Sequence, residues 1–156
     1  MLKSVTAARF GEWAGGRDRE AALKNFMGEA SLLGKDEKEV HAKEIANDPE
    51  RVQMMINMTA YGGGNPAYPT VDGFLADMAD FETPIDFASI TVPTLVVHGD
   101  KDGDIPFSQA EQAANGIPNS ELYKVENGWH CLMFHNDYKT IYARETSFMK
   151  KHLGLD

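Results

Sequence analysis

The chain has 156 residues, with 24 acidic and 15 basic side chains, so its formal net charge is −9. This length suits one domain, and a hydrophobic fraction of 42% can supply a packed core, which excludes disorder throughout the chain. The acidic balance argues against nucleic acid and anionic membrane surfaces as partners.

Residues 1–84 carry helical patterns. Asp36 and Glu39 have the spacing of a capping box, which predicts the start of a helix. Asp48 precedes Pro49, and proline is preorganised for the first helical position, so this pair predicts another start. The expected helices cover residues 17–33, 36–45, 49–61 and 71–81.

The period of the hydrophobic pattern changes in residues 85–156. Pro93–Gly99 is short and almost wholly apolar, which is typical of a strand covered on both faces of a parallel sheet. Ser120–Val125 predicts a second strand. Between the strands, the capping box formed by Ser108 and Glu111 predicts a helix that ends at Gly116.

A long last helix is expected from Asn136 to its stop at Gly154. The order strand, helix, strand, helix predicts two parallel strands joined by a right-handed crossover. Sheets typically have about four to six strands, whereas the sequence offers only two, and the edge at Thr94 has no partner. We therefore expect self-association or a complementing chain.

The loops after the two strands hold the candidate chemistry, because ligand sites in open parallel sheets lie beyond the carboxyl ends of the strands. The first loop contains the carboxylates of Asp100, Asp102 and Asp104, and the second contains His130. A carboxylate from one loop and the imidazole from the other would meet at the same sheet edge. There the carboxylate would fix the histidine tautomer and stabilise the imidazolium. This spacing favours the acid and base of a nucleophile-activating system.

The segment from Pro93 to His130 resembles the C-terminal portion of the α/β-hydrolase fold family. The shared features are the strand Pro-Thr-Leu-Val-Val-His-Gly, the pattern G-x-x-D-x-x-I-P ending at Pro106, and a second strand leading to G-x-H. The resemblance implies that Asp102 is the acid and His130 the general base of a Ser-Asp-His triad.

The implied fold class is α/β: a partial α/β-hydrolase fold. A helical lid or cap in residues 1–84 would precede a β-α-β-α unit with two parallel strands in residues 85–156. The family's nucleophile elbow, G-x-S-x-G, is absent, since no serine lies between glycines at that spacing. We therefore expect the nucleophile outside this chain, and hydrolysis of a small ester or related acyl substrate only in its presence.

Three interpretations of the missing nucleophile stay open. The chain is a fragment of such an enzyme, or another chain supplies the nucleophile half, or the chain is a non-catalytic binding or interaction module derived from the fold. Haloperoxidase-like or dehalogenase-like chemistry is an alternative to ester hydrolysis, because reactions vary freely on one fold.

Other residues have competing interpretations. Asp100, Asp102 and Asp104 match ligand positions of a calcium loop, but Ile105 replaces the required glycine, so no metal site is expected. Asp100 and Asp104 are then expected to be turn residues on a solvated loop. Cys131 is expected to be a buried, inert thiol rather than a nucleophile.

Trp129, Met55 and Met58 are candidates for lining an apolar substrate pocket, with core packing as the alternative. His98 and the other remaining histidines are expected to be structural. A single cysteine excludes an internal disulfide and a structural zinc site, and no stretch reaches membrane-spanning length. We therefore expect a cytoplasmic protein that binds a small-molecule substrate and needs no cofactor, metal or membrane.

Overall fold

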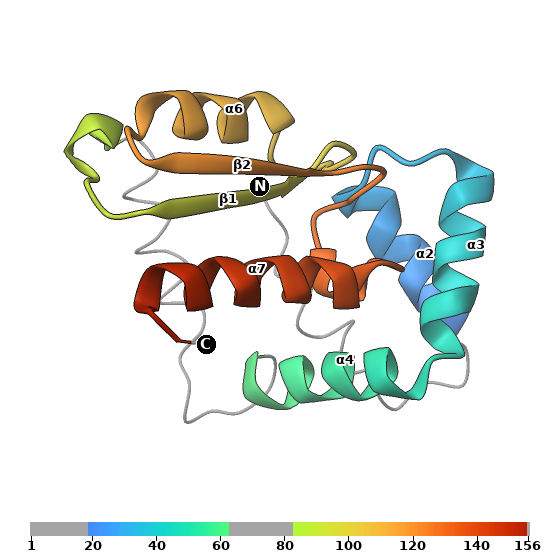
Figure 1. The fold of residues 1–156 in the computed structure, drawn as a ribbon. Helices are drawn as coiled ribbons and strands as arrows, with labels where there is room; N and C mark the ends of the chain where they lie inside the picture. Colours follow the sequence, from blue (N-terminus) through green and yellow to red (C-terminus); the bar gives the residue numbers. More distant parts are fainter. Residues whose placement is uncertain (1–18, 63–82, 156) are drawn as a thin grey trace. The chain divides into compact units, whose positions relative to one another are not determined.

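The computed structural model describes residues 19–62 and 83–155. The helix expected at 71–81 lies outside these residues. Figure 1 shows the described elements in chain order. They are α2 (Arg19–Ala30), α3 (Lys35–Ala46), α4 (Pro49–Gly62), η1 (Phe87–Ser89), β1 (Thr94–Gly99), α6 (Phe107–Gly116), β2 (Ser120–Val125), η2 (Leu132–Phe134) and α7 (Tyr138–Leu153).

The chain divides into two compact units, which we describe separately. One consists of residues 1–26 and 42–85, and the other of residues 27–41 and 86–156. Both strands therefore belong to the second unit.

The second unit is built on the parallel pair of β1 and β2. The register places Thr94 beside Ser120 and Gly99 beside Val125. α6 connects the strands and lies against both of them, while α7 runs on the other side of the strands (Figure 1). The predicted strand–helix–strand–helix order and the parallel pairing are confirmed.

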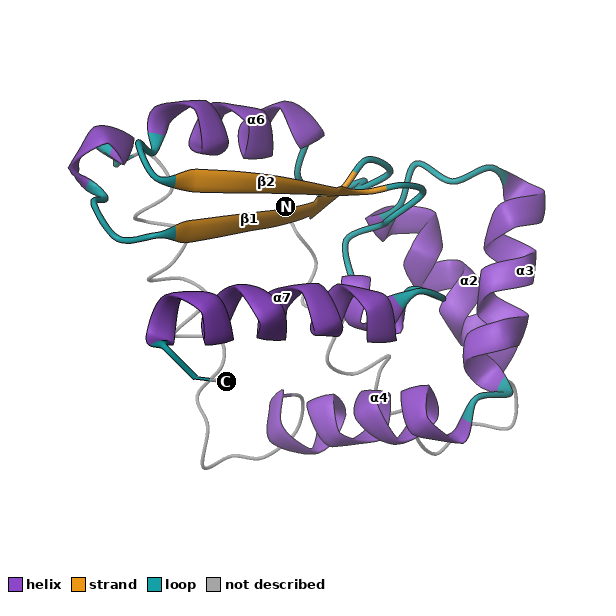
Figure 2. Ribbon diagram, in the orientation of Figure 1, coloured by secondary structure: helices purple, strands orange, loops and turns teal. Residues whose placement is uncertain are grey.

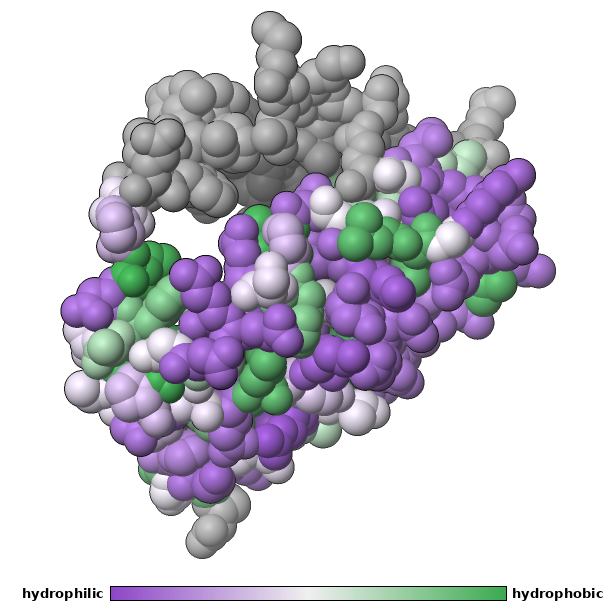
Figure 3. Space-filling model, turned by 90° about the horizontal axis from the view of Figure 1, so that it is seen from above, coloured by the Kyte–Doolittle hydropathy of each residue, from purple (hydrophilic) through white to green (hydrophobic). Residues whose placement is uncertain are grey.

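The sheet is only partly covered in the described part of the chain. Leu95, Val96 and Val97 on β1 are only half-buried, and Leu122 on β2 is 39% exposed. In Figure 3, hydrophobic side chains reach the surface as green patches among polar ones. Burial on both faces is what stabilises parallel strands, and the described part of the chain supplies only part of that covering.

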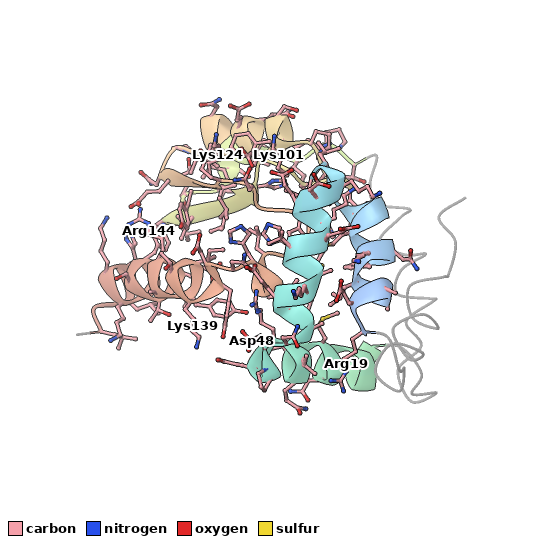
Figure 4. All side chains as sticks on the ribbon, turned by 90° about the vertical axis from the view of Figure 1, so that its right-hand side faces the viewer. Arg19, Asp48, Lys101, Lys124, Lys139 and Arg144 are labelled. Atoms are coloured by element: carbon pink, nitrogen blue, oxygen red, sulfur yellow. The ribbon has the colours of Figure 1, made fainter. Side chains whose placement is uncertain are left out.

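α7 is attached through an apolar and a polar contact. Tyr138 and Ile141, in its first turns, are buried. Farther along, Arg144, which Figure 4 labels, pairs with Glu121 of β2, and the Lys151 ammonium lies 3.1 Å from the same carboxylate. The hydrogen bond from Lys151 lowers the pKa of Glu121. Because these charges are exposed, the apolar contact is the stronger attachment.

The start of α3 differs from the sequence prediction. The helix begins at Lys35, and the Gly34 N–H donates a 2.7 Å hydrogen bond to Glu37 Oε2. This is the backward half of a capping box, placed two positions before the one predicted from Asp36 and Glu39. The predicted box is therefore wrong, because several acidic residues follow one another and the chain pattern alone does not choose among them.

The later helices begin without side-chain caps. α6 starts at Phe107 and α7 at Tyr138, and neither N-cap residue makes a capping hydrogen bond. The capping box predicted from Ser108 and Glu111 is therefore wrong. α7 ends at Gly154 as predicted, where a φ of 66° lies in the left-handed region that glycine adopts without strain.

α2 ends at Ala30, earlier than the sequence predicts. Ser31 forms an isolated antiparallel bridge with Asp102, and the Leu32 N–H donates to the Lys101 carbonyl at 2.8 Å. Tertiary hydrogen bonds thus replace the last helical turn that the local pattern favours.

In the first unit, α4 begins at Pro49 as predicted, with Asp48 as its cap. Asp48 Oδ1 accepts hydrogen bonds from the N–H groups of Glu50 at 2.9 Å and Arg51 at 3.3 Å. Its Oδ2 accepts from Nε of the buried Arg51 at 2.8 Å, and this guanidinium also donates to the Glu44 carbonyl at 3.2 Å. Figure 4 labels Asp48 at the start of α4.

Apolar side chains form the interior of this unit. Its buried hydrophobic residues include Leu23, Ala42, Ile45, Val52 and Met55. Among the residues that the structure describes, no helix combines the length and the apolar character that a membrane span requires.

We expect the substitution Asp48→Ala to lower the free energy of unfolding by about 1–3 kcal/mol, because it removes both the cap and a partner of Arg51. Burial raises the pKa of Asp48, but the hydrogen bonds from Arg51 and Glu50 outweigh it and hold the pKa below its usual 3.8. The stabilisation is therefore complete above pH 3.8 and fades as the pH falls through the lower folded-state value.

Urea unfolding of the wild type and the variant at neutral and acid pH measures this difference. Asp36→Ala is the matched control, since Asp36 lies in the first turn of α3 and has no capping role. An equal loss of stability in the two variants would contradict the assignment of Asp48 as the cap.

Candidate active site

The loops that follow β1 and β2 are joined by hydrogen bonds. The Lys101 N–H donates to the Gly128 carbonyl at 2.8 Å, and the Asn127 N–H donates to Asp100 Oδ1 at 2.7 Å. Figure 2 shows both loops leaving the same end of the sheet. Asp100 lies in a turn, as predicted, and in addition crosslinks the two loops.

Two glycines allow the loops to approach this closely. A β-carbon on Gly99 would lie 2.2 Å from the Gly128 carbonyl oxygen, and one on Gly128 would lie 2.8 Å from the Gly99 Cα. No side chain fits at such distances from another backbone. The pair of glycines thus fixes the separation of the loops that carry Asp102 and His130.

Asp102 and His130, the two residues that the sequence singles out, meet at this edge. His130 Nδ1 lies 3.1 Å from Asp102 Oδ2 and 3.3 Å from Oδ1. Because an ionised carboxylate only accepts hydrogen bonds, Nδ1 carries the hydrogen in this contact. The Asp102 side chain is 7% exposed and that of His130 is 41% exposed. The carboxylate is therefore enclosed while the imidazole reaches solvent.

The backbone orients the Asp102 carboxylate. Its Oδ1 accepts the N–H groups of Asp104 at 2.8 Å and Ile105 at 2.9 Å. Asp102 thus forms a turn with its own loop, as aspartate commonly does at strand ends. These two bonds compensate for burial of the charge and leave Oδ2 directed at imidazole nitrogens.

Two further titratable side chains, which the sequence analysis did not place in the site, face this pair. His98 Nε2 lies 3.6 Å from Asp102 Oδ2, and Asp104 Oδ2 lies 3.7 Å from His130 Nε2. Both distances are too long for hydrogen bonds. The signal that could have found His98 is its position: it is the last side chain of β1 before the loop.

Ala30 connects both loops to the end of α2. Its carbonyl oxygen accepts the N–H of Gly103 at 3.3 Å and the N–H of His130 at 3.3 Å. A β-carbon on Gly103 would lie 2.6 Å from the backbone nitrogen of Ser31, so this approach also depends on glycine. Residues 30–32 hold the site through their backbone, which explains why their side chains gave no sequence signal.

Two of the three predicted pocket residues are buried. Trp129 is fully buried, with its ring centroid 6.5 Å from that of Phe134. Met55 is buried in the first unit, and the side chain of Met58 lies outside the described part. Among described residues, no group of three or more histidine, cysteine, aspartate or glutamate side chains could hold a metal ion.

Cys131 is buried next to His130. Burial raises the pKa of its thiol to about 12, and the carboxylates of Asp104 and Asp102 act in the same direction. At neutral pH the group is therefore a neutral thiol, which is a poor nucleophile.

The chain is similar in sequence to known proteins. No protein-family model matches the chain. It is 32% identical over 91 residues to the AB hydrolase superfamily protein YisY of Bacillus subtilis, which covers 58% of this chain and 32% of the relative. It is 31% identical over 113 residues to a Synechocystis sp. protein provisionally named a non-heme chloroperoxidase, which covers 72% and 36% respectively.

A solved structure shares the fold. An alpha/beta hydrolase fold protein from Nakamurella multipartita aligns with a TM-score of 0.79 at 22% identity, over 95% of this chain and 51% of that one. The chain therefore belongs to the α/β-hydrolase superfamily and has part of its fold, as the sequence resemblance indicated. It spans about a third of the length of the two curated relatives and about half of the structural neighbour.

We expect Gly99→Ala to destabilise the chain by about 1–3 kcal/mol or more, because the new methyl group collides with the Gly128 backbone. In the folded population, the contact between Asp102 and His130 should loosen, which the ring signals of His130 in an NMR spectrum would report.

Gly28→Ala is the matched control. A β-carbon at Gly28, inside α2, meets no atom within 4 Å. We expect it to raise stability by about 0.5–1 kcal/mol, as alanine does in a helix interior. Unchanged stability and unchanged His130 signals in the Gly99 variant would contradict the role given to the two glycines.

We expect the Cys131 thiol of the folded chain to react with iodoacetamide at least about tenfold more slowly at neutral pH than in the chain unfolded by guanidinium. Because the folded-state pKa is raised, the stabilisation from the neutral thiol is complete below the usual value of 9.0 and is lost as the pH rises toward about 12. Equal rates in the folded and unfolded chains would show that the thiol is accessible and reactive.

Proposed function

We propose that Asp102 and His130 are the acid and the general base of a Ser-Asp-His triad that hydrolyses a small ester or related acyl substrate. The observation that carries the proposal is the 3.1 Å contact of the enclosed Asp102 carboxylate with His130 Nδ1, at the carboxyl ends of parallel strands. With Nδ1 bound to the carboxylate, Nε2 is the nitrogen that takes the proton of the attacking hydroxyl.

In this proposal the nucleophile comes from a polypeptide segment outside residues 1–156. This view is supported by the hydroxyls of Ser31 and Ser120, which donate hydrogen bonds to backbone carbonyls. Ser31, which bridges to Asp102 through its backbone, is buried and donates its hydroxyl to the Met27 carbonyl at 2.7 Å. Ser120 donates its hydroxyl to the Ala114 carbonyl at 2.5 Å. The structural neighbour is about twice as long as this chain, so the fold has room for such a segment.

The same proposal assigns the remaining parts of the chain. Residues 1–84 form the lid or cap, and residues 85–156 form the core segment. The half-buried strand β1 and the exposed Leu122 of β2 are where the complementing segment, or a second copy, would cover the sheet. The substrate would be a small molecule.

A chloroperoxidase-type reaction is a second candidate. One observation favours it: the 31% identity to the Synechocystis protein that carries this name. The same acid and base would then serve a peroxide-dependent reaction on the completed fold. Halide-dependent halogenation in the presence of hydrogen peroxide, compared with hydrolysis of p-nitrophenyl acetate, would separate the two candidates.

We expect residues 1–156 alone to hydrolyse no p-nitrophenyl ester and to bind no fluorophosphonate label, because a base and an acid without a nucleophile leave nothing to acylate. Ser31→Ala controls for unexpected labelling of the buried hydroxyl. Stoichiometric labelling of any serine in this chain, with turnover, would contradict the proposal.

The completed enzyme gives the positive test. Reading the coding sequence upstream of Met1 for an in-frame G-x-S-x-G would identify one source of the nucleophile, and coexpression would test another chain. In the active form, Asp102→Asn should lower kcat by about ten-thousandfold, as loss of a triad acid does. Asp86→Asn, an exposed change before η1, should leave kcat unchanged.

A further inference from the structure

Resting on the proposed function, a further role follows from the side chain of Asp100. We propose that Asp100 is a positioning residue for His130: its carboxylate holds the turn at Asn127 in the left-handed conformation from which the chain continues to His130. Asp100 Oδ1 accepts the Asn127 N–H at 2.7 Å, between the loops that follow β1 and β2. This bond reaches the histidine loop at its backbone, so Asp100 acts through the turn and not on the reacting atoms.

The turn after β2 includes a residue in the left-handed region. β2 ends at Val125, and the Gly128 N–H donates back to the Val125 carbonyl at 3.1 Å, which closes a four-residue turn. The third residue of this turn, Asn127, has a φ of 56°. Asparagine tolerates a positive φ better than most residues but less freely than glycine. A hydrogen bond that holds the Asn127 N–H in this conformation therefore stabilises the turn.

The turn lies close to His130 along the chain. Only Gly128 and Trp129 separate Asn127 from His130, and Trp129 is fully buried. These two residues leave little length in which a change of backbone direction could be absorbed. Release of the left-handed conformation at Asn127 would therefore displace the His130 ring from Asp102.

The Asp100 side chain completes a set of three hydrogen bonds between the loops. The Asp100 N–H donates to the Val125 carbonyl at 3.2 Å, and the Lys101 N–H donates to the Gly128 carbonyl at 2.8 Å. Both bonds join backbone atoms, which residues other than proline provide whatever their side chains. The third bond, to Asn127, depends on an oxygen of the Asp100 side chain. A substitution at Asp100 can therefore release the turn and leave the backbone pairing in place.

A cation supports the Asp100 carboxylate. The Lys124 ammonium lies 3.7 Å from Asp100 Oδ2 and 2.8 Å from Glu126 Oε1. The hydrogen bond to Glu126 raises the pKa of Lys124, and the charge of Asp100 acts in the same direction. Lys124 is therefore positive at neutral pH and offsets the repulsion between the carboxylates around it. Oδ1 of Asp100, whose side chain is 20% exposed, is thus available for the Asn127 N–H.

The test uses the 156-residue chain labelled with ¹⁵N and ¹³C. Hydrogen exchange reports whether the Asn127 amide is held, and nuclear Overhauser effects between the His130 ring and residues 102–105 report whether the ring stays beside Asp102. In Asp100→Ala we expect the Asn127 amide to exchange about ten- to a hundredfold faster, because it loses a hydrogen bond to a charged acceptor. The Overhauser effects from the His130 ring should weaken or disappear.

Two substitutions separate the hydrogen bond from the charge. Asp100→Asn keeps an oxygen that can accept the Asn127 N–H, so we expect it to retain the His130 contacts that Asp100→Ala loses. Glu126→Ala is the matched control in the same turn, because the Glu126 carboxylate is 71% exposed and pairs with Lys124. It removes one negative charge, as both Asp100 variants do, and should leave the Asn127 exchange and the His130 contacts unchanged.

A second pair of variants tests the turn itself. Asn127→Ala and Asn127→Gly both remove the side chain and keep the N–H that Asp100 binds. Alanine disfavours a positive φ, whereas glycine adopts it freely. We therefore expect Asn127→Ala to weaken the contacts between His130 and residues 102–105, and Asn127→Gly to keep them. If Asp100→Ala fails to fold, this pair and Asp100→Asn decide.

Unchanged His130 contacts in a folded Asp100→Ala chain would overturn the proposal, as would loss of these contacts in a folded Asp100→Asn chain or equal behaviour of the two Asn127 variants. The spectra need no nucleophile, so they decide independently of the proposed hydrolysis. In the completed enzyme, Asp100→Ala should lower kcat by about a hundredfold with little change in KM, as a misplacement of about 1 Å does. An unchanged kcat with a displaced His130 ring would contradict the proposed catalytic role of His130 and not its positioning by Asp100.

Discussion

The contact between the backbones of Gly99 and Gly128 is the constraint on which the rest of the site depends. Parallel pairing of β1 and β2 in register brings the carboxyl ends of both strands to one edge, but pairing alone does not join the loops beyond them. A β-carbon at Gly99 would lie 2.2 Å from the other loop, so the approach exists only because both positions lack side chains. The distance between the acid and the imidazole follows from it.

Near this contact, hydrogen bonds both stabilise and orient the buried carboxylate of Asp102. An enclosed carboxylate is costly unless its oxygens are paired, and Asp102 meets that requirement with two N–H groups of its own loop on Oδ1. The second oxygen then points toward His130 and His98. The same hydrogen bonds therefore form the local turn, compensate the buried carboxylate of Asp102 and direct it at the imidazole of His130. A change to any one of these contacts affects the others.

The two-stranded sheet is only partly covered by the described chain. Parallel strands depend on coverage of both faces, yet Val96 and its neighbours on β1 are half-buried and Leu122 on β2 is exposed. A structural neighbour of about twice the length shares this fold over 95% of the chain. Incomplete coverage of the sheet is thus consistent with the proposed further polypeptide segment at this sheet.

The sequence by itself determined the strands and their parallel order, because these depend on the local hydrophobic period and on the topology of a crossover, and its resemblance to the α/β-hydrolase fold singled out Asp102 and His130. It did not determine the helix starts, where adjacent acidic residues offer equivalent caps, or the end of α2, where tertiary hydrogen bonds replace a helical turn. Nor did it place Ala30 and His98 at the site. Only the tertiary structure decided these points, because a backbone carbonyl has no sequence signature and the charge around a histidine depends on neighbours that the fold supplies.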